Sequence, residues 1–199
     1  MTGEDPKTVE GWHFCGEDLK LGYNDGRSIR AGETLTVEGT PVICSYGLHA
    51  CEKALDALNY ASGPIICRVR LSGTVIQGTG ENVDKYAATS RTVLWMADAT
   101  NVLHEFACWC AEKALRGERL ASREPDPRSW AAIEMKRIWL RGEVTHKELY
   151  VTADAARAAT LAAEMAATAR AAAWAADRDE QNEKLEAMLN ALEGEQDDQ

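Results

Sequence analysis

The sequence predicts an α+β protein in three parts: a mostly antiparallel head over residues 1–97, a helical connector over 98–150, and a C-terminal segment, 151–199, with one long alanine-rich helix and an acidic tail. Two observations lead to this prediction. Apolar and polar residues alternate in several short segments of the first half, as they do in half-buried strands. In the second half, apolar residues recur every three or four positions, as they do on one face of a helix.

The expected strands of the head are short apolar or alternating segments between turn signals, at 8–15, 34–37, 42–44, 65–71 and 92–96. The clearest is 65–71, where Cys67 and Val69 fall on one face and Arg68 on the other. We expect Gly73 to interrupt this strand. One helix is expected over residues 50–60, where the apolar spacing changes to that of a helix and Ser62-Gly63-Pro64 follows.

Two helices are predicted in the connector. The first starts near Asn101, and its buried face carries Leu103, Phe106, Cys110 and Ala114. Pro125 and Pro127 are expected to break the chain, and the second helix covers 130–140 and ends at Gly142.

The final helix is expected to begin at Thr152 or Asp154 and to run to about Leu192. Its first half is rich in alanine, and its second half carries the apolar stripe Leu185, Met188, Leu189 and Leu192. A stripe this narrow does not stabilise an isolated helix of that length. We therefore expect the helix to pack on the connector helices, on a second copy of the chain as a homo-oligomer, or on both, and the tail from Glu193 to be disordered.

Charge and composition exclude some classes of partner. The 199 residues carry a net charge of −10, which repels phosphate backbones and anionic lipid, so neither general nucleic-acid binding nor membrane binding is expected. The first residues contain no apolar signal segment, and no stretch is long and apolar enough to span a bilayer. We expect a cytoplasmic protein, in a host cell if phage-encoded, whose six cysteines are reduced.

The most informative motif lies in the middle of the head. Gly47-Leu48-His49 precedes the expected helix. Asn59-Tyr60 closes this helix, and Tyr60 lies 13 positions after Gly47. Trp12-His13 comes earlier in the chain, with His13 34 positions before Gly47. This arrangement resembles the ADP-ribosyltransferase fold, which includes the poly(ADP-ribose) polymerases. In that fold a first-strand histidine holds a ribose of NAD, and a tyrosine stacks on nicotinamide. The resemblance covers about residues 11–97.

The resemblance implies a head that binds NAD or another nucleotide. Aromatic rings stack on bases, histidine bonds ribose hydroxyls, and arginine matches phosphate oxygens. The residues expected to bind the ligand are Trp12, His13, Arg27, Arg30, His49, Tyr60 and Arg91.

The sequence departs from this fold at the catalytic acid. Transferases of the fold place a glutamate at the start of a late strand, but Ala88-Thr89-Ser90-Arg91 precedes the segment 92–96. We therefore assign no catalytic residue and expect sequestration of a nucleotide signal rather than transfer of ADP-ribose. An active transferase remains an alternative, as does an enzyme like the RNA 2′-phosphotransferases, which use histidine and arginine.

The same residues also resemble an uncharacterised domain of phage and bacterial proteins with alanine-rich tails. Residues 104–180 resemble the helical part of sequences labelled putative immunity proteins. These resemblances imply a phage-type accessory protein with a role in counter-defence. A further alternative is a non-enzymatic interaction module that binds a host partner through its helices.

A metal site is the remaining alternative. His13-x-Cys15 and His49-x-Cys51 each place a histidine and a cysteine two positions apart, and together they offer a zinc ligand set. Zinc ligands are more often separated by two to four residues. We therefore predict no metal.

Overall fold

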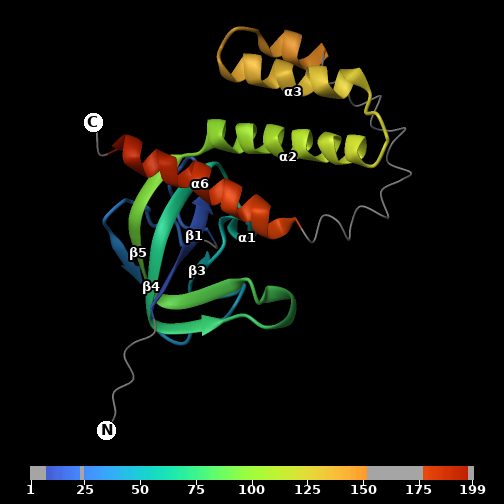
Figure 1. Cartoon of the computed structure of the whole chain (residues 1–199). Coiled ribbons are helices and arrows are strands. Elements are labelled where there is room, and N and C mark those ends of the chain that lie inside the picture. Colours follow the sequence, from blue (N-terminus) through green and yellow to red (C-terminus); the bar gives the residue numbers. More distant parts are fainter. Residues whose placement is uncertain (1–7, 23–24, 152–176, 197–199) are drawn as a thin grey trace. The chain divides into compact units, whose positions relative to one another are not determined.

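The computed structural model describes residues 8–22, 25–151 and 177–196 (Figure 1). They divide into two compact units. The first contains the described residues up to Thr100 together with those from Asn182 onward, and the second contains those between 101 and 181.

The first unit is built on an antiparallel sheet of five strands: β1 (Val9–Cys15), β2 (Thr34–Thr36), β3 (Leu48–Cys51), β4 (Ile65–Gln77) and β5 (Lys85–Asp98). The strand order is β2-β5-β3-β1-β4, and β4 also pairs with β5. The four strands β5, β3, β1 and β4 therefore close into a ring, and every pairing is antiparallel. The predicted α+β class with a mostly antiparallel head is confirmed.

The hairpin of β4 and β5 is longer than predicted. Its register runs from Ile65 opposite Asp98 to Gln77 opposite Tyr86, with one shift between Arg68 and Val69 and another between Ser72 and Val75. Gly73 lies at the second shift with φ +75°, so it bends β4 without ending it. The interruption predicted at Gly73 corresponds to this register shift, and pairing with β5 resumes at Val75, so the strand continues beyond it.

Two other predicted elements differ from the structure. Residues 42–44 form a turn instead of a strand, in which Val42 N donates to Tyr46 O at 2.7 Å and Cys44 has φ +61°. The helix predicted over 50–60 shrinks to α1 (Ala54–Leu58), because the residues before it belong to β3. Cys51 is opposite Trp12 and Lys85, and this cross-strand pairing is not visible in the local apolar spacing.

The core of the first unit fills the inside of the strand ring. It includes Ile29 from the loop before β2, Ala88 and Val93 from β5, and alternate residues of β4, namely Cys67, Val69 and Leu71. The opposite face of β1 carries Trp12 and Phe14, both 2% exposed, and Trp12 packs edge-on against Trp95 at 5.8 Å.

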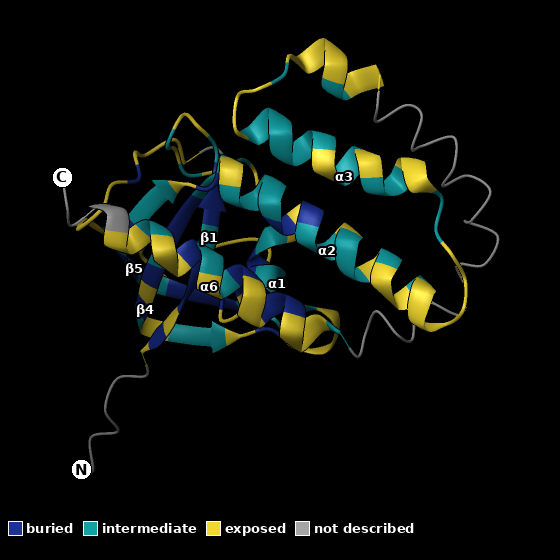
Figure 2. Ribbon diagram, turned by 45° about the horizontal axis from the view of Figure 1, so that its top comes forward, coloured by how far each residue is buried: buried dark blue, intermediate teal, exposed yellow. Residues whose placement is uncertain are grey.

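Helix α6 (Arg178–Gln196) lies across the sheet beside α1 (Figure 1, Figure 2). Its Leu185 and Leu189 have no exposed surface. A carboxylate oxygen of Glu186 accepts from Trp12 Nε1 at 3.1 Å and from Ala54 N at 3.0 Å. α1 has no side-chain cap of its own at Lys53, so α6 supplies the acceptor for the first turn of α1.

Asn182 adds a second cap, because its Oδ1 accepts from Leu55 N at 3.0 Å. α6 also continues to Gln196, so the prediction of a disordered tail from Glu193 was wrong as far as Gln196. The alanine-rich stretch over 152–176 lies outside the described residues, together with Thr152 and Asp154 as its expected caps. Assembly of several copies through this stretch stays a prediction.

The second unit contains α2 (Thr100–Leu120), whose residues from Asn101 onward belong to it, and α3 (Pro127–Leu140). Asp126 caps α3, since its side chain accepts from Arg128 N at 2.8 Å, and Pro127 occupies the first turn. Pro127 therefore begins a helix that was predicted to start only at residue 130. Gly142, with φ +75°, ends it as predicted.

Helices α2 and α3 are joined by ion pairs. Arg137 of α3 contacts Glu105 at 2.9 Å and Glu112 at 3.0 Å on α2. Phe106 is buried on α2, as predicted. The other buried residue of this helix is Cys108, whereas the prediction placed Cys110 on the buried face. No helix in the described ranges is long and apolar enough to cross a membrane.

Candidate functional site

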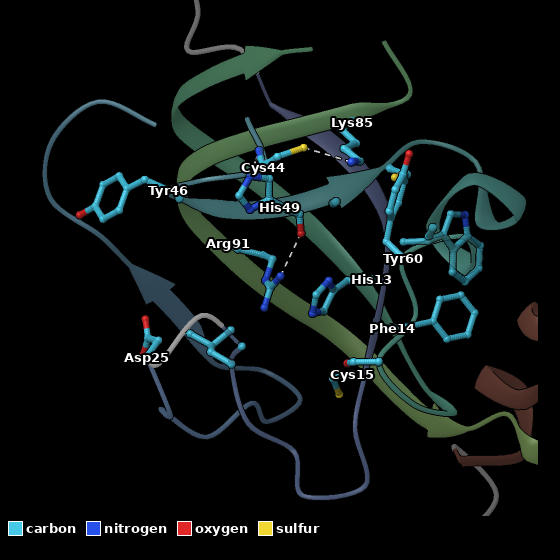
Figure 3. A pocket seen from close by; sticks show the side chains of 18 of the residues that line it. His13, Phe14, Cys15, Asp25, Cys44, Tyr46, His49, Tyr60, Lys85 and Arg91 are labelled. Atoms are coloured by element: carbon cyan, nitrogen blue, oxygen red, sulfur yellow. Dashed lines mark hydrogen bonds between the residues drawn. The ribbon is translucent and has the colours of Figure 1, made fainter. Parts of the chain in front are cut away.

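A cavity of about 630 Å³ opens into the first unit beside β1, β3 and β5 (Figure 3). Five of the seven residues predicted to bind a ligand line it: Trp12, His13, His49, Tyr60 and Arg91. The structure thus brings His13, His49, Tyr60 and Arg91 to one cavity, whereas the ring of Trp12 packs against Trp95 on the opposite face of β1. Whether they hold a ligand stays a prediction.

Arg27 and Arg30 do not line this cavity. The guanidinium of Arg27 binds Asp25, with Nε 2.7 Å from Oδ1, and also donates to Thr36 O at 2.8 Å. The side chain of Arg30 is 69% exposed and contacts Glu33 at 3.5 Å. Both arginines have partners close by in the sequence, and these partners keep them at the surface.

Arg91 is buried at the cavity wall, with only 1% of its surface exposed. Strand pairing puts it there: Arg91 is opposite Leu35 on β2 and Leu71 on β4, and opposite residues of paired strands share a face. Leu71 belongs to the core, so Arg91 must point inward as well. The alternation with Val93, two positions later, is the sequence signal for this orientation.

The guanidinium of Arg91 is only partly satisfied. Its Nη1 donates to His49 O at 2.9 Å, whereas Nε and Nη2 are buried with no hydrogen-bond partner in the described part of the chain (Figure 3). Burial lowers the pKa of Arg91 to about 10, against the opposing influence of Cys67, Cys15 and Asp25. Arg91 is therefore charged at neutral pH, and the edge that it leaves unpaired is the one that binds carboxylate or phosphate in a bidentate manner.

Two neutral histidines stand near this charge. The pKa of His13 lies well below its usual value, because burial removes water and the charges of Arg91 and His49 oppose protonation. The pKa of His49 is lowered by burial and by Arg91, while hydrogen bonds with the backbone at Val42 and Gly47 act in the opposite direction. Cys44 N donates to His49 Nε2 at 3.2 Å, so the proton of the neutral ring is on Nδ1.

These shifts predict that acid destabilises the protein. Below the ordinary histidine pKa of about 6.5, the unfolded chain binds protons that the folded chain does not, so stability falls as the pH decreases. We expect the free energy of unfolding to drop by up to about 1.4 kcal/mol per pH unit for each histidine. Urea denaturation between about pH 7 and about pH 5 measures this slope.

The matched variants are His13→Gln and His49→Gln, each of which should reduce the slope. His104 of the second unit, whose pKa burial also lowers, is present in every variant and cancels in the comparison. A slope unchanged in both variants would show that neither cavity histidine is buried in its neutral form.

The rim of the cavity carries Tyr60, which is 48% exposed. The ammonium of Lys85 lies 3.6 Å from the centre of the Tyr60 ring, and the phenol donates to Asp84 Oδ2 at 2.9 Å. Burial and Asp84 raise the pKa of Tyr60, so the phenol keeps its proton. One face of the ring therefore holds a cation, and a stacked base would use the other face.

Lys85 and Cys44 also line the cavity, and the sequence reasoning missed both. Lys85 Nζ donates to Cys44 Sγ at 3.1 Å and to Asn82 Oδ1 at 3.2 Å (Figure 3). The turn before β3 brings Cys44 to residues at the start of β5, and no motif in the sequence announces this approach.

Among the described residues that line the cavity, the one carboxylate is Asp25, and Arg27 already binds it through Nε and Nη2. In the described ranges no group of three or more His, Cys, Asp or Glu side chains is placed to hold a metal ion. The cavity thus combines one unpaired guanidinium with neutral histidines, thiols and an aromatic rim.

Comparison with known proteins adds one match. No curated protein and no solved structure shows significant similarity to this chain. Residues 9–105, which cover the five strands and the start of α2, match the family described as Domain of unknown function (DUF7666).

Proposed function

We propose that the head binds a phosphate-bearing nucleotide of the NAD class and holds it without converting it. The observation that carries this proposal is the unpaired Nε and Nη2 edge of Arg91, which is buried at the cavity wall.

An unpaired buried charge destabilises the folded chain by several kcal/mol unless an opposite charge or hydrogen bonds offset it. The bond from Nη1 to His49 O leaves the Nε and Nη2 edge without a partner among the described residues, and Asp25 is engaged by Arg27. A phosphate or carboxylate on the ligand satisfies two donors at once and neutralises the charge. Arg91 therefore favours an anionic ligand over a neutral one.

The rest of the cavity suits the remainder of a nucleotide. Its volume of about 630 Å³ falls within the usual range for small-molecule sites. The exposed face of Tyr60 offers a surface on which a base or nicotinamide stacks. A neutral histidine both donates and accepts hydrogen bonds, which suits the hydroxyl groups of ribose, and His13 and His49 are of this kind.

Capture is favoured over turnover by the same inventory of side chains. General acid–base catalysis uses a group whose pKa lies near the working pH and that reaches the reacting atom. The only carboxylate among the described lining residues is paired with Arg27. Burial lowers the pKa of both His13 and His49, away from neutral pH. The proposal extends to sequestration of a nucleotide signal as the outcome of binding.

Isothermal titration of the full chain tests the proposal with NAD, ADP-ribose, a cyclic dinucleotide, adenosine and inorganic pyrophosphate. We expect binding of at least one nucleotide that carries phosphate, and none of adenosine, because it lacks the anion for Arg91. Chromatography of the ligand after incubation and denaturation should recover it unchanged.

Three outcomes contradict parts of the proposal. Release of free nicotinamide or of a cleaved product would favour a transferase or a 2′-phosphotransferase-like enzyme over capture. Equal affinity for adenosine and its phosphates would remove Arg91 as the anchor. No heat from any of the probes would favour the interaction module, in which the head is a scaffold.

A further inference from the structure

Two cysteines of neighbouring strands meet next to the cavity. Cys15 of β1 and Cys67 of β4 have their sulfur atoms 4.0 Å apart, and both are free thiols. In the register of β1 and β4, Cys67 is opposite His13 and Cys15 is opposite Ile65, so the two cysteines are diagonal neighbours on the same face. Cys15 is 1% exposed and Cys67 is 0% exposed. Small rotations of the two buried side chains would bring the sulfur atoms together.

The two thiols differ in access. Cys15 lines the cavity and Cys67 does not, so a small solute that enters the cavity meets Cys15 first. A hydrogen bond from Cys67 lowers the pKa of Cys15, and the charge of Arg91 lowers it further against the effect of burial. Donating that bond and being buried raise the pKa of Cys67. Cys15 is therefore the better nucleophile of the pair, and Cys67 holds its proton.

Cys51, another cysteine that lines the cavity, lacks these features. Burial raises the pKa of Cys51 to about 12, so it stays protonated. The charge of Arg91 acts to lower the pKa of both Cys15 and Cys67. The unpaired guanidinium that attracts an anionic ligand is thus also the group that favours the thiolate of Cys15.

We propose that Cys15 and Cys67 form a dithiol that a small peroxide oxidises to a disulfide inside the cavity. The Cys15 thiolate attacks one oxygen of hydrogen peroxide, the O–O bond breaks, and hydroxide leaves, which gives Cys15 sulfenic acid. The sulfur of Cys67 then attacks the Cys15 sulfur; its proton and the departing hydroxyl form water, and the S–S bond closes. Two thiols and one peroxide yield one disulfide and two waters.

This inference does not rest on nucleotide binding. It needs the contact between the two sulfurs, the opening of the cavity to Cys15 and the charge of Arg91. A small oxidant enters whether or not the cavity serves a larger ligand.

The experiment treats the full chain with hydrogen peroxide, alkylates the remaining thiols under denaturing conditions and maps the peptides by mass spectrometry. We expect a cross-linked peptide pair that contains Cys15 and Cys67 and has lost two hydrogens. Cys67→Ser should instead give a sulfenic acid at Cys15, which dimedone traps. Arg91→Met should slow oxidation of Cys15 about tenfold or more, because the thiolate loses its neighbouring charge.

Cys44→Ser is the matched control, and it should leave the cross-link and its rate unchanged. The proposal is overturned if Cys15 and Cys67 both remain alkylatable after the exposed Cys44 has been oxidised. It is also overturned if Cys67→Ser yields no dimedone adduct at Cys15 while the variant keeps the thermal transition of the unmodified chain.

Discussion

Replacing Arg91 by methionine is expected to weaken binding of a phosphate-bearing nucleotide by about 30-fold or more. Removing one partner of a buried, hydrogen-bonded charge pair costs about 2–5 kcal/mol of binding free energy, and each 1.4 kcal/mol is a factor of ten. Methionine keeps much of the length of the side chain but supplies neither donor nor charge. Titration calorimetry with the best ligand of the panel measures the loss.

Two further variants make this test specific. Arg30→Met applies the same change to an exposed arginine outside the cavity and should leave the affinity unchanged. Arg91→Lys retains a charge but not the bidentate edge, so its affinity should lie between those of the methionine variant and the unmodified chain. Equal affinity in Arg91→Lys and the unmodified chain would mean that charge alone, rather than the free edge, recognises the ligand.

Arg91→Met is expected to leave the ligand-free protein at least as stable as the unmodified chain. Replacing buried charged groups by apolar groups of similar volume is often neutral or stabilising. An unchanged or higher thermal midpoint, together with lost binding, would show that Arg91 serves the ligand rather than the fold. A midpoint that falls by many degrees would instead mean that the bond from Nη1 to His49 O holds β3 and β5 together.

Truncating the buried side chains of α6 is expected to destabilise the head severely. Leu185→Ala and Leu189→Ala should each lower the free energy of unfolding by about 2–5 kcal/mol, since both leucines have no exposed surface. Domains of this size are stable by only about 5–15 kcal/mol. Deleting residues 178–199 removes both leucines and the caps on α1, and we expect that chain not to fold cooperatively in urea.

Leu192→Ala is the matched control, because Leu192 lies on the same helix but is only half-buried. Its cost should be clearly smaller than that of either buried leucine. Glu186→Gln keeps an oxygen acceptor for Ala54 and should cost less than Glu186→Ala, which leaves the first turn of α1 without it. If all five substitutions had equal and small effects, α6 would not be part of the cooperative unit.

The strands that the sequence revealed are those with local alternation. β1 and the first half of β4 were predicted closely. In β4, for example, Val69 and Leu71 are buried while Arg70 between them is exposed. The extension of β4 past Gly73 and of β5 back to Lys85 depends on pairing between the two strands. Short, apolar β3 carries the same residue types as a helix, and only its partners distinguish the two.

The candidate site was predictable to a similar extent. His13, His49, Tyr60 and Arg91 line one cavity, whereas Arg27 and Arg30 bind acids near them in the sequence. The sequence shows which side chains suit a ligand, but it does not show which partners those side chains have in the fold. The contact of Lys85 with Cys44, and that of Cys15 with Cys67, are set by strand register and turn geometry, which have no local signal.

The head is assembled from two stretches of chain separated by residues 101–181, and this makes those residues a tether. A tether holds α6 near its binding site at an effective concentration that is commonly in the millimolar range. Cleavage within residues 101–181 would turn the docking of α6 into an equilibrium between two molecules. The nicked protein would then lose α6, and with it the caps on α1, on simple dilution, at concentrations where the intact chain stays folded.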